Sequence, residues 1–373
     1  MDSKFKYLIG ALAILLTALT AWFLKSIVLY ITISIILSLI GQPLVRLFSK
    51  IKIRRFRFPS SVNALLALIT MILLLAAFFS LFIPLLVEEA RIVSKINPLD
   101  VVAAFQEPLK NLEQFLQKYQ ISMGDGEPIE KIIASKLTSV FGFHEISNYA
   151  RQIIGVTGSI IAAFFSISFI TFFLMEDEHL IYNIVLLLTP AKLTEKVKEI
   201  MSDSKRLLTR YFIGILLDMA FVAACTSIGL SIFGLKNAML IGLFAGILNV
   251  IPYIGPLLGA GFAILIGVSC NLNLDFYTQL IPLIGKIAMT FLAVQLLDAL
   301  FFQPLVISKT VKAHPLEIFL VILTAGTAAG IGAMVIAVPV YTIIRIFAKE
   351  FLNNFKIVQK LTADLEDPSK KNI

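Results

Sequence analysis

The stretch N-V-I-P-Y-I-G-P-L-L-G-A-G, from Asn249 to Gly261, interrupts a strongly apolar segment with residues that break helices. It holds two prolines and three glycines; proline removes a backbone donor, and glycine loosens a helix. In hydrocarbon every backbone polar group needs a partner, so such a break cannot face lipid. We therefore predict that it is buried in protein or borders a water-filled cavity.

The composition explains why lipid is the relevant solvent. The chain has 373 residues, of which 58% are hydrophobic and 15% are charged, and its mean hydropathy is +0.91. A soluble domain is about 45–50% apolar and about 25% charged. Apolar runs of about 18 residues or more recur along the chain, as expected for helices that cross a bilayer. The sequence therefore predicts an all-α, polytopic membrane helix bundle.

Charge and reactive side chains argue against several other classes of protein. The net charge is +8, but the basic residues cluster in loops beside apolar segments, and no basic patch interleaves with aromatic residues as nucleic-acid binding requires. Cys225 and Cys270 lie in apolar segments, which favours buried thiols over a disulfide. The three histidines are scattered without metal-ligand or catalytic spacing. We expect no enzyme, no metal, no cofactor and no nucleic-acid partner.

Residues 1–87 are predicted to form an N-terminal region of three spans, at about 8–24, 27–45 and 61–87. A cleaved signal peptide over the first run is disfavoured because the second run begins almost immediately. The segment from Arg46 to Phe58 is densely basic and contains no acid. Because cytoplasmic loops carry an excess of Lys and Arg, we expect this loop in the cytoplasm.

Residues 88–150 form the one substantial hydrophilic insertion. Apolar residues recur in it every three or four positions, which predicts a small extracytoplasmic helical domain, either a solvated helical hairpin or an oligomer contact or lid. The transmembrane core is predicted over 151–348, with a cytoplasmic amphipathic helix pair at 176–210 that Pro190 divides. Residues 349–373 are polar and rich in lysine, which predicts a cytoplasmic tail.

Two apolar segments of the core carry breaks, and both are predicted to be hairpins. Residues 237–251 are too short for a comfortable span, which needs about 20 residues, and the proline-rich break comes directly after them. Residues 316–347 are interrupted by Gly326, Gly330 and Gly332. Each hairpin would re-enter on one side or cross twice with short arms. Transporters use such breaks to aim helix ends at substrate or ions; the alternative is a surface turn between two spans.

Ionisable residues inside spans are candidates for function, because each costs at least ~2.5 kcal/mol on insertion scales. Asp298 lies three residues after Gln295 on one helix face, and we expect it to face the bundle or a cavity and to carry a proton or bind a cation. Gln303 is about 140° away on an ideal helix and need not share that face. Asp218 is either part of this path or hydrated near the cytoplasmic surface. The predicted substrate or ion path comprises Asn249, Pro252, Tyr253, Gly255, Pro256, Gln295, Asp298, Gln303 and Asp218.

An ordered series of motifs resembles the autoinducer-2 exporter family, also called PerM-type permeases. The series comprises Asn249 to Pro256, Gln295 to Pro304, His314-Pro315-Leu316, the three glycines of the second hairpin and Ala337-Val338-Pro339, with Glu176-Asp177-Glu178 upstream. The resemblance implies a multi-pass, oligomeric protein of the bacterial cytoplasmic membrane. It also implies export of small molecules such as autoinducer-2 or, for some members, sodium/proton antiport. Family members often carry Glu-Asn where this chain has Asp298-Ala299, so this chain keeps the acid and lacks that amide.

The function predicted from these features is secondary transport or export of a small polar solute by a homo-oligomer in the bilayer. No G-x-x-x-x-G-K-[ST] motif is present, so coupling would be to protons or sodium rather than to ATP. One alternative is a sodium/proton antiporter of the same family. Another is a non-transporting membrane scaffold that binds partners through residues 88–150. An intramembrane enzyme is disfavoured because no nucleophile or metal set accompanies Asp218 and Asp298.

Overall fold

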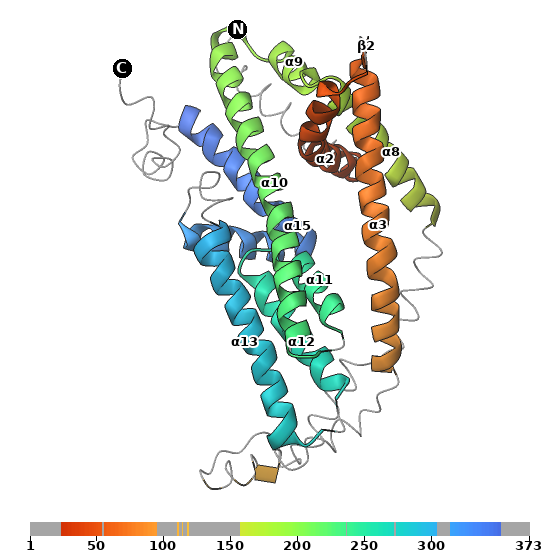
Figure 1. The fold of residues 1–373 in the computed structure, drawn as a ribbon. Helices are drawn as coiled ribbons and strands as arrows, with labels where there is room; N and C mark the ends of the chain where they lie inside the picture. The colour runs from red at the N-terminus through yellow and green to blue at the C-terminus, as the bar shows by residue number, and fades with distance from the viewer. Residues whose placement is uncertain are drawn as a thin grey trace. The chain divides into compact units, whose positions relative to one another are not determined.

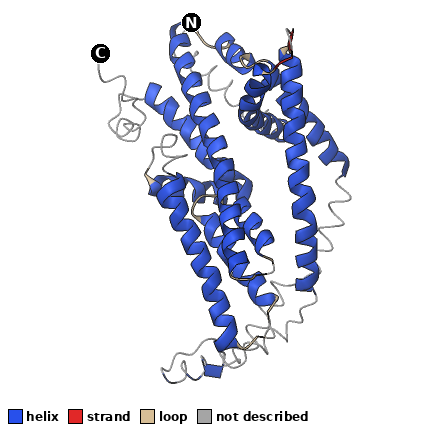
Figure 2. Ribbon diagram, viewed as in Figure 1, coloured by secondary structure: helices blue, strands red, loops and turns tan. Residues whose placement is uncertain are grey.

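The structure is a computed structural model that describes residues 24–53, 56–94, 157–235, 237–271, 274–303 and 314–351, together with Lys110, Asn111, Gln114 and Lys118. The described chain is almost entirely helical (Figures 1 and 2), which confirms the predicted all-α membrane class. The first predicted span, nearly all of the hydrophilic insertion and the C-terminal tail lie outside the described residues. The predicted domain boundaries therefore stay predictions.

The long helices begin and end close to the predicted spans. They are α2 (Lys25–Lys50), α3 (Ser60–Ser94), α8 (Thr157–Glu176), α9 (Leu180–Leu187), α10 (Thr194–Ile232), α11 (Ala238–Leu248), α12 (Ile254–Ser269), α13 (Ile281–Leu297) and α15 (Pro315–Phe351). A 3-10 turn, η1 (Ala191–Leu193), precedes α10, and two π-helical turns, η2 (Phe276–Leu280) and η3 (Asp298–Phe302), flank α13. The basic loop contains a minimal antiparallel ladder of β1 (Lys52–Ile53) and β2 (Phe56–Arg57).

Several of the described helices are long and apolar enough to cross a membrane. Five meet this criterion singly, namely α2, α3, α10, α15 and α13 with its flanking π-turns. A sixth candidate span joins α8 to α9 across a bend of 84°. α11 and α12 are apolar but shorter, as expected for the arms of a hairpin. The described part of the chain is therefore that of a multi-pass membrane protein.

The chain divides into two compact units. The first contains residues 1–75 and 153–201, and in it α2 packs against α8. The Ser34 hydroxyl joins these two helices by donating to the carbonyl oxygens of Tyr30, at 2.7 Å, and Ile167, at 3.1 Å. A small core of Ala64, Ala67 and Met175 completes this unit.

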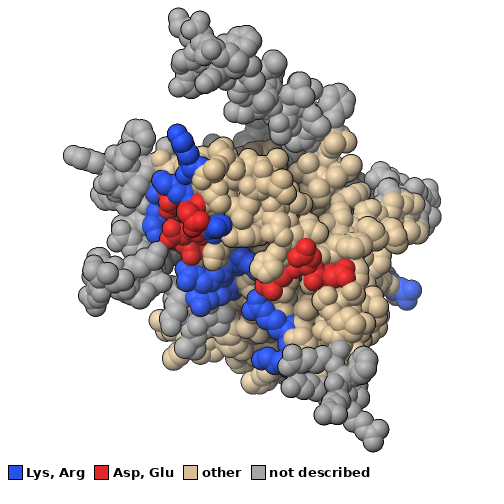
Figure 3. Space-filling view, turned by 90° about the horizontal axis from the view of Figure 1, so that it is seen from above, with Lys and Arg blue, Asp and Glu red and all other residues tan. Residues whose placement is uncertain are grey.

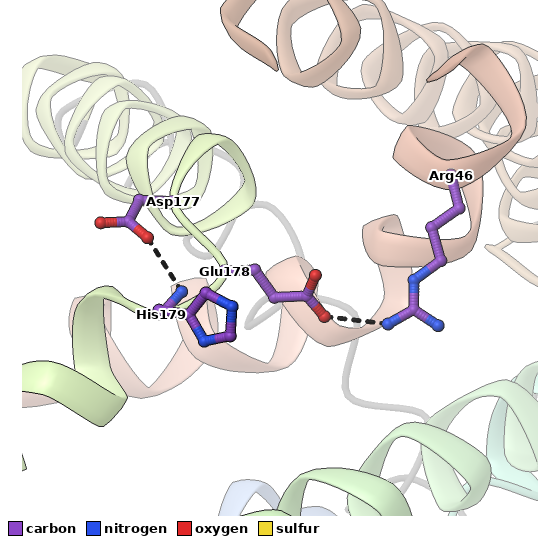
Figure 4. Close-up of polar contacts among 4 residues, drawn as sticks. All are labelled: Arg46, Asp177, Glu178 and His179. Atoms are coloured by element: carbon purple, nitrogen blue, oxygen red, sulfur yellow. Dashed lines mark hydrogen bonds and ion pairs between the residues drawn. The ribbon is translucent and has the colours of Figure 1, made fainter. Parts of the chain in front are cut away.

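An acidic turn separates α8 from α9 in the first unit (Figure 4). Asp177 accepts a hydrogen bond from the His179 backbone N–H at 2.9 Å, and Glu178 forms an ion pair with Arg46 of α2 at 2.8 Å. The Ser61 hydroxyl of α3 donates to Glu176. The acidic turn therefore ties the ends of three helices together, which holds α9 at its sharp angle to α8.

The second unit contains residues 76–152 and 202–373, and it holds both interrupted segments. α11 packs on α12, and α12 packs on α13 (Figure 1). Its largest core cluster comprises Leu230, Ala238, Ile241, Ala263, Ile266 and Ile287. These residues come from α10 to α13, so one apolar core holds the four helices together.

α10 differs from the prediction for residues 176–210. Pro190 does separate α9 from the second amphipathic helix, but that helix does not end near residue 210 and continues without a break through the apolar residues to Ile232. α10 has 39 residues and is therefore about 58 Å long, whereas the hydrocarbon core is about 30 Å thick. Its N-terminal part carries the ion pairs Glu195–Lys198 and Asp203–Arg206. Acidic and basic side chains both appear on the face drawn in Figure 3.

Candidate functional site

The first interruption is a tight turn between α11 and α12. α11 ends at Leu248 with Asn249 as its C-cap. The backbone N–H of Ile254 donates to the carbonyl oxygen of Pro252 at 2.8 Å, and Tyr253 between them has φ 66° and ψ −46°. A hydrogen bond over two residues with a positive central φ defines a rare and strained γ-turn. Residues held in such conformations persist where the surrounding structure determines them, often at functional sites.

Close backbone contact explains the glycine after this turn. A Cβ atom added to Gly255 would lie 2.0 Å from the carbonyl oxygen of Leu248, so no other residue fits there without movement. A Cβ atom at Gly259 would lie 3.3 Å from Cα of Ala245. These pairs are centred at or just before residue 252, as expected for two antiparallel arms that fold back at the prolines. Pro256 falls in the first turn of α12, where a helix needs no N–H donor.

The second interruption folds α15 back on itself. Ala329 has φ −145° and ψ 15°, and Gly330 has φ 77° and ψ −166°. The Tyr341 hydroxyl donates to Oε2 of Glu317 at 3.0 Å, although residues 24 positions apart in a straight helix would be about 36 Å apart. Met334 packs so closely on Gly326 that a Cβ atom there would lie 2.1 Å from Met334 Cε. α15 therefore consists of two arms joined at Ala329–Gly330.

The two interrupted segments contact each other. The ring of Tyr253, at the tip of the first hairpin, lies edge-on to the ring of Phe319 in the first arm of α15, with centroids 6.4 Å apart. Tyr253 is 47% exposed, so this ring also retains a free surface. The strained turn of one hairpin is thus supported by the arm of the other.

Two carboxyl groups in the second unit form a buried pair. Asp218 of α10 is 4% exposed and Asp298 of η3 is fully buried, and the two carboxyl groups are close enough to interact with each other. Asn249 donates its amide to Asp218 Oδ2 at 2.7 Å, and Gln303 donates to Asp298 Oδ2 at 2.7 Å. Among the described residues, neither Oδ1 atom has a hydrogen-bond donor. We call Asp218, Asp298, Asn249 and Gln303 the carboxyl cluster.

A π-helical turn brings Gln303 into the carboxyl cluster. On an ideal α-helix, a residue five positions after Asp298 would point about 140° away. Here the backbone N–H of Gln303 donates to the carbonyl oxygen of Asp298, which is the i→i+5 pattern of a π-turn. This turn places the two side chains over each other. The stacked rings of Phe221 and Phe302, 4.6 Å apart, hold the π-turn against α10.

Two glycines of α11, Gly242 and Gly246, place Asn249 beside Asp218, and neither was among the predicted site residues. Gly242 and Gly246 of α11 lie so close to α10 that a Cβ atom at Gly246 would be 2.5 Å from the carbonyl oxygen of Met219. Their G-L-F-A-G spacing in the sequence could have predicted this close contact, because two glycines four residues apart let membrane helices approach closely. One turn later Asn249 therefore meets Asp218.

The remaining predicted residues are distributed around this cluster. Gln295 is half-buried one turn before Asp298, and within the described residues its side chain makes no hydrogen bond to the carboxyl cluster. Asp218 is packed inside protein, so the alternative of a hydrated surface position does not describe this structure. Gly332 has no heavy atom within 4 Å of an added Cβ atom and takes no part in the break. No group of three or more His, Cys, Asp or Glu in the described residues could hold a metal ion.

The sequence also matches a known protein family and several of its relatives. The model of the family described as "AI-2E family transporter" matches residues 12–353. Several relatives carry names that begin "Putative transport protein". YueF of Bacillus subtilis is 29% identical over 351 residues, covering 93% of this chain and 90% of YueF. YrrI of Bacillus subtilis is 28% identical over 187 residues, covering 50% of each chain, and sll0060 of Synechocystis sp. is 24% identical over 301 residues, covering 80% and 81%.

Proposed function

Because this chain belongs to the AI-2E transporter family, we propose that it is a secondary transporter that exports a small polar solute in exchange for protons or sodium ions. The chain is a membrane transport protein with several apolar spans. What we propose beyond membrane transport itself is the class of solute, the direction of transport and the coupling ion. A small signal molecule of the autoinducer-2 type is the solute class that the family name favours.

The buried carboxyl pair is the observation that supports ion coupling. Removing an ionised carboxylate from water is expensive, and two carboxylates in contact repel each other. The Asp218–Asp298 pair can therefore stay buried only if it holds a proton or a cation between its oxygens. The amides of Asn249 and Gln303 occupy the Oδ2 atoms, so the two Oδ1 atoms are the ones left to bind it.

The helix ends around the pair favour a positively charged occupant. α11 ends at Leu248, one residue before the Asn249 side chain that contacts Asp218. The C-terminal end of a helix carries partial negative charge on its free carbonyl groups and attracts cations. Broken helices in transporters use such ends to bind coupling ions near the membrane midplane. The same arrangement would serve a sodium/proton antiporter, which is the second candidate function.

The proposed topology rests on the charges. We expect the basic loop from Arg46 to Phe58 and the charged start of α10 in the cytoplasm of a bacterial cell, with the C-terminus on the same side. Residues 88–150 would then lie outside. The hydrogen bond of 2.8 Å from Asn111 to the Tyr277 hydroxyl supports this, because it joins that insertion to the opposite end of α13 from the carboxyl cluster. A homo-oligomer remains part of the proposal.

Flux measurements in proteoliposomes test the proposal. Purified protein would be given imposed pH and sodium gradients, with ²²Na⁺, a trapped pH dye and an autoinducer-2-type solute as probes. We expect Asp218→Asn and Asp298→Asn to lower gradient-driven flux at least about tenfold, since each removes a charge that holds the coupling ion. Asp203→Asn is the matched control, because it makes the same change on α10 at a 36% exposed carboxylate paired with Arg206.

The outcomes separate the candidate functions. Flux of sodium and protons without any solute would favour the antiporter over the exporter. Full activity of Asp298→Asn, with an unchanged dependence on pH, would contradict ion coupling through the carboxyl pair. Absence of flux for every solute and ion, together with a partner bound by residues 88–150, would instead favour the scaffold.

A further inference from the structure

One face of α10 carries a row of buried polar groups that the packing leaves without partners. The hydroxyl groups of Ser204, Tyr211 and Thr226 and the Oδ1 atom of Asp218 are buried and have no hydrogen-bond partner among the described residues. We call these four residues the α10 polar row. Among the described residues only two other side-chain atoms share this condition, and one of them, Asp298 Oδ1, belongs to the carboxyl pair beside Asp218.

The spacing of the α10 polar row is that of a single helix face. Its members succeed each other after seven, seven and eight residues. At about 100° per residue, all four fall within an arc of about 80°. At about 1.5 Å per residue, the row is about 33 Å long, close to the roughly 30 Å of the hydrocarbon core. The row therefore begins at Ser204, in the charged N-terminal part of α10 beside the Asp203–Arg206 ion pair, and continues into the apolar part of the helix past the carboxyl pair.

The helix itself does not satisfy these groups. Ser and Thr hydroxyls inside helices commonly bond to the carbonyl group four residues before them. Thr290 and Thr342 do so in this structure, at 2.9 Å and 2.8 Å. The hydroxyls of Ser204 and Thr226 make no such bond. A buried polar group without a partner destabilises the packing, so the hydroxyl groups of Ser204, Tyr211 and Thr226 impose a penalty that apolar side chains would not incur, whereas Asp218 has the Asp298 carboxyl group beside it.

We infer that the α10 polar row lines the transport path and that its groups meet water or the polar solute when the path opens. This inference rests on the proposed function and adds the location of the path. In the described packing the row is closed, because the four atoms are out of contact with solvent. The penalty of the closed packing is then relieved in the open one, where each of the three hydroxyl groups gains a hydrogen-bond partner. The path runs past the carboxyl pair, so solute and coupling ion would share it.

Thiol labelling of single-cysteine variants tests this path without knowledge of the solute. Cys225 and Cys270 would first be replaced by serine, and Ser204→Cys and Thr226→Cys introduced one at a time, since each keeps the size of the side chain. The controls are Leu217→Cys and Ile228→Cys on the opposite side of α10, which are 52% and 61% exposed and would face lipid. Ile228 lies only two residues from Thr226, so this control matches its depth in the membrane.

The probe is a membrane-impermeant, positively charged methanethiosulfonate reagent, applied to membrane fragments that are open on both sides. We expect Ser204→Cys and Thr226→Cys to react at least about tenfold faster than the two controls, because a thiol in hydrocarbon forms little reactive thiolate. Size-exclusion profiles and retained flux would show that each variant is folded.

The two proposals fail in different ways. If the variants carry out gradient-driven flux but Thr226→Cys reacts no faster than Ile228→Cys, the path does not run along the α10 polar row, although transport stands. If the row is labelled as expected but no flux is found under any gradient, the row is hydrated and the transport function is wrong.

Discussion

Gly330 provides a quantitative test of the break in α15. Its φ of 77° and ψ of −166° lie in a region open almost only to glycine, where another residue costs about 1–3 kcal/mol. No heavy atom lies within 4 Å of an added Cβ atom, so Gly330→Ala would change the backbone energy without a steric clash. The expected loss of stability is therefore about 1–3 kcal/mol.

Gly332 is the matched control two residues away. It lies in the helical part of the second arm, and an added Cβ atom again meets nothing within 4 Å. Alanine is favoured over glycine inside a helix by about 0.8–1 kcal/mol, so Gly332→Ala should stabilise the protein. The two variants make the same chemical change with opposite signs, and their expected separation is about 2–4 kcal/mol.

The assay is reversible unfolding of the purified protein by sodium dodecyl sulfate in mild-detergent micelles, monitored by circular dichroism at 222 nm. A separation of about 2–4 kcal/mol corresponds to roughly 30- to 700-fold in the folding equilibrium constant. If Gly330→Ala were as stable as Gly332→Ala, the left-handed break at Gly330 would not exist in the folded protein. The hairpin interpretation of α15 would then be wrong.

Three further changes test neighbouring features. Gly255→Ala should destabilise the folded protein by about 3 kcal/mol, because its Cβ would meet a backbone carbonyl oxygen. Gly261→Ala, with open space around the added Cβ, should be neutral or stabilising. Equal unfolding midpoints for the two variants would contradict the close turn. Tyr341→Phe should lower stability by about 1 kcal/mol by removing the hydrogen bond between the arms of α15, and an unchanged midpoint would argue that the bond is absent in the membrane. Gln303→Leu should lower ion-driven flux severalfold by leaving Asp298 Oδ2 unpaired, and unchanged flux at all pH values would exclude Gln303 from the site.

The helical spans and their interruptions were predictable from the sequence alone. Hydropathy is a local property, so the length of each apolar run identified the spans that the structure describes. Proline and glycine restrict or free the backbone at their own positions, which is why the breaks near Pro252 and Gly330 fell where they were expected. Asp218 and Asp298 were recognisable because charged residues are rare inside apolar segments.

Only the tertiary structure decided which of these residues meet. Asp218 and Asp298 are 80 positions apart, and their contact depends on α10 packing against the π-turn after α13. Gln303 reaches Asp298 because the backbone leaves α-helical geometry at that point, which an ideal helical wheel does not anticipate. The partnerless groups of the α10 polar row became visible only with all their neighbours in place, because satisfaction of a hydrogen bond is a property of the packing and not of the residue type.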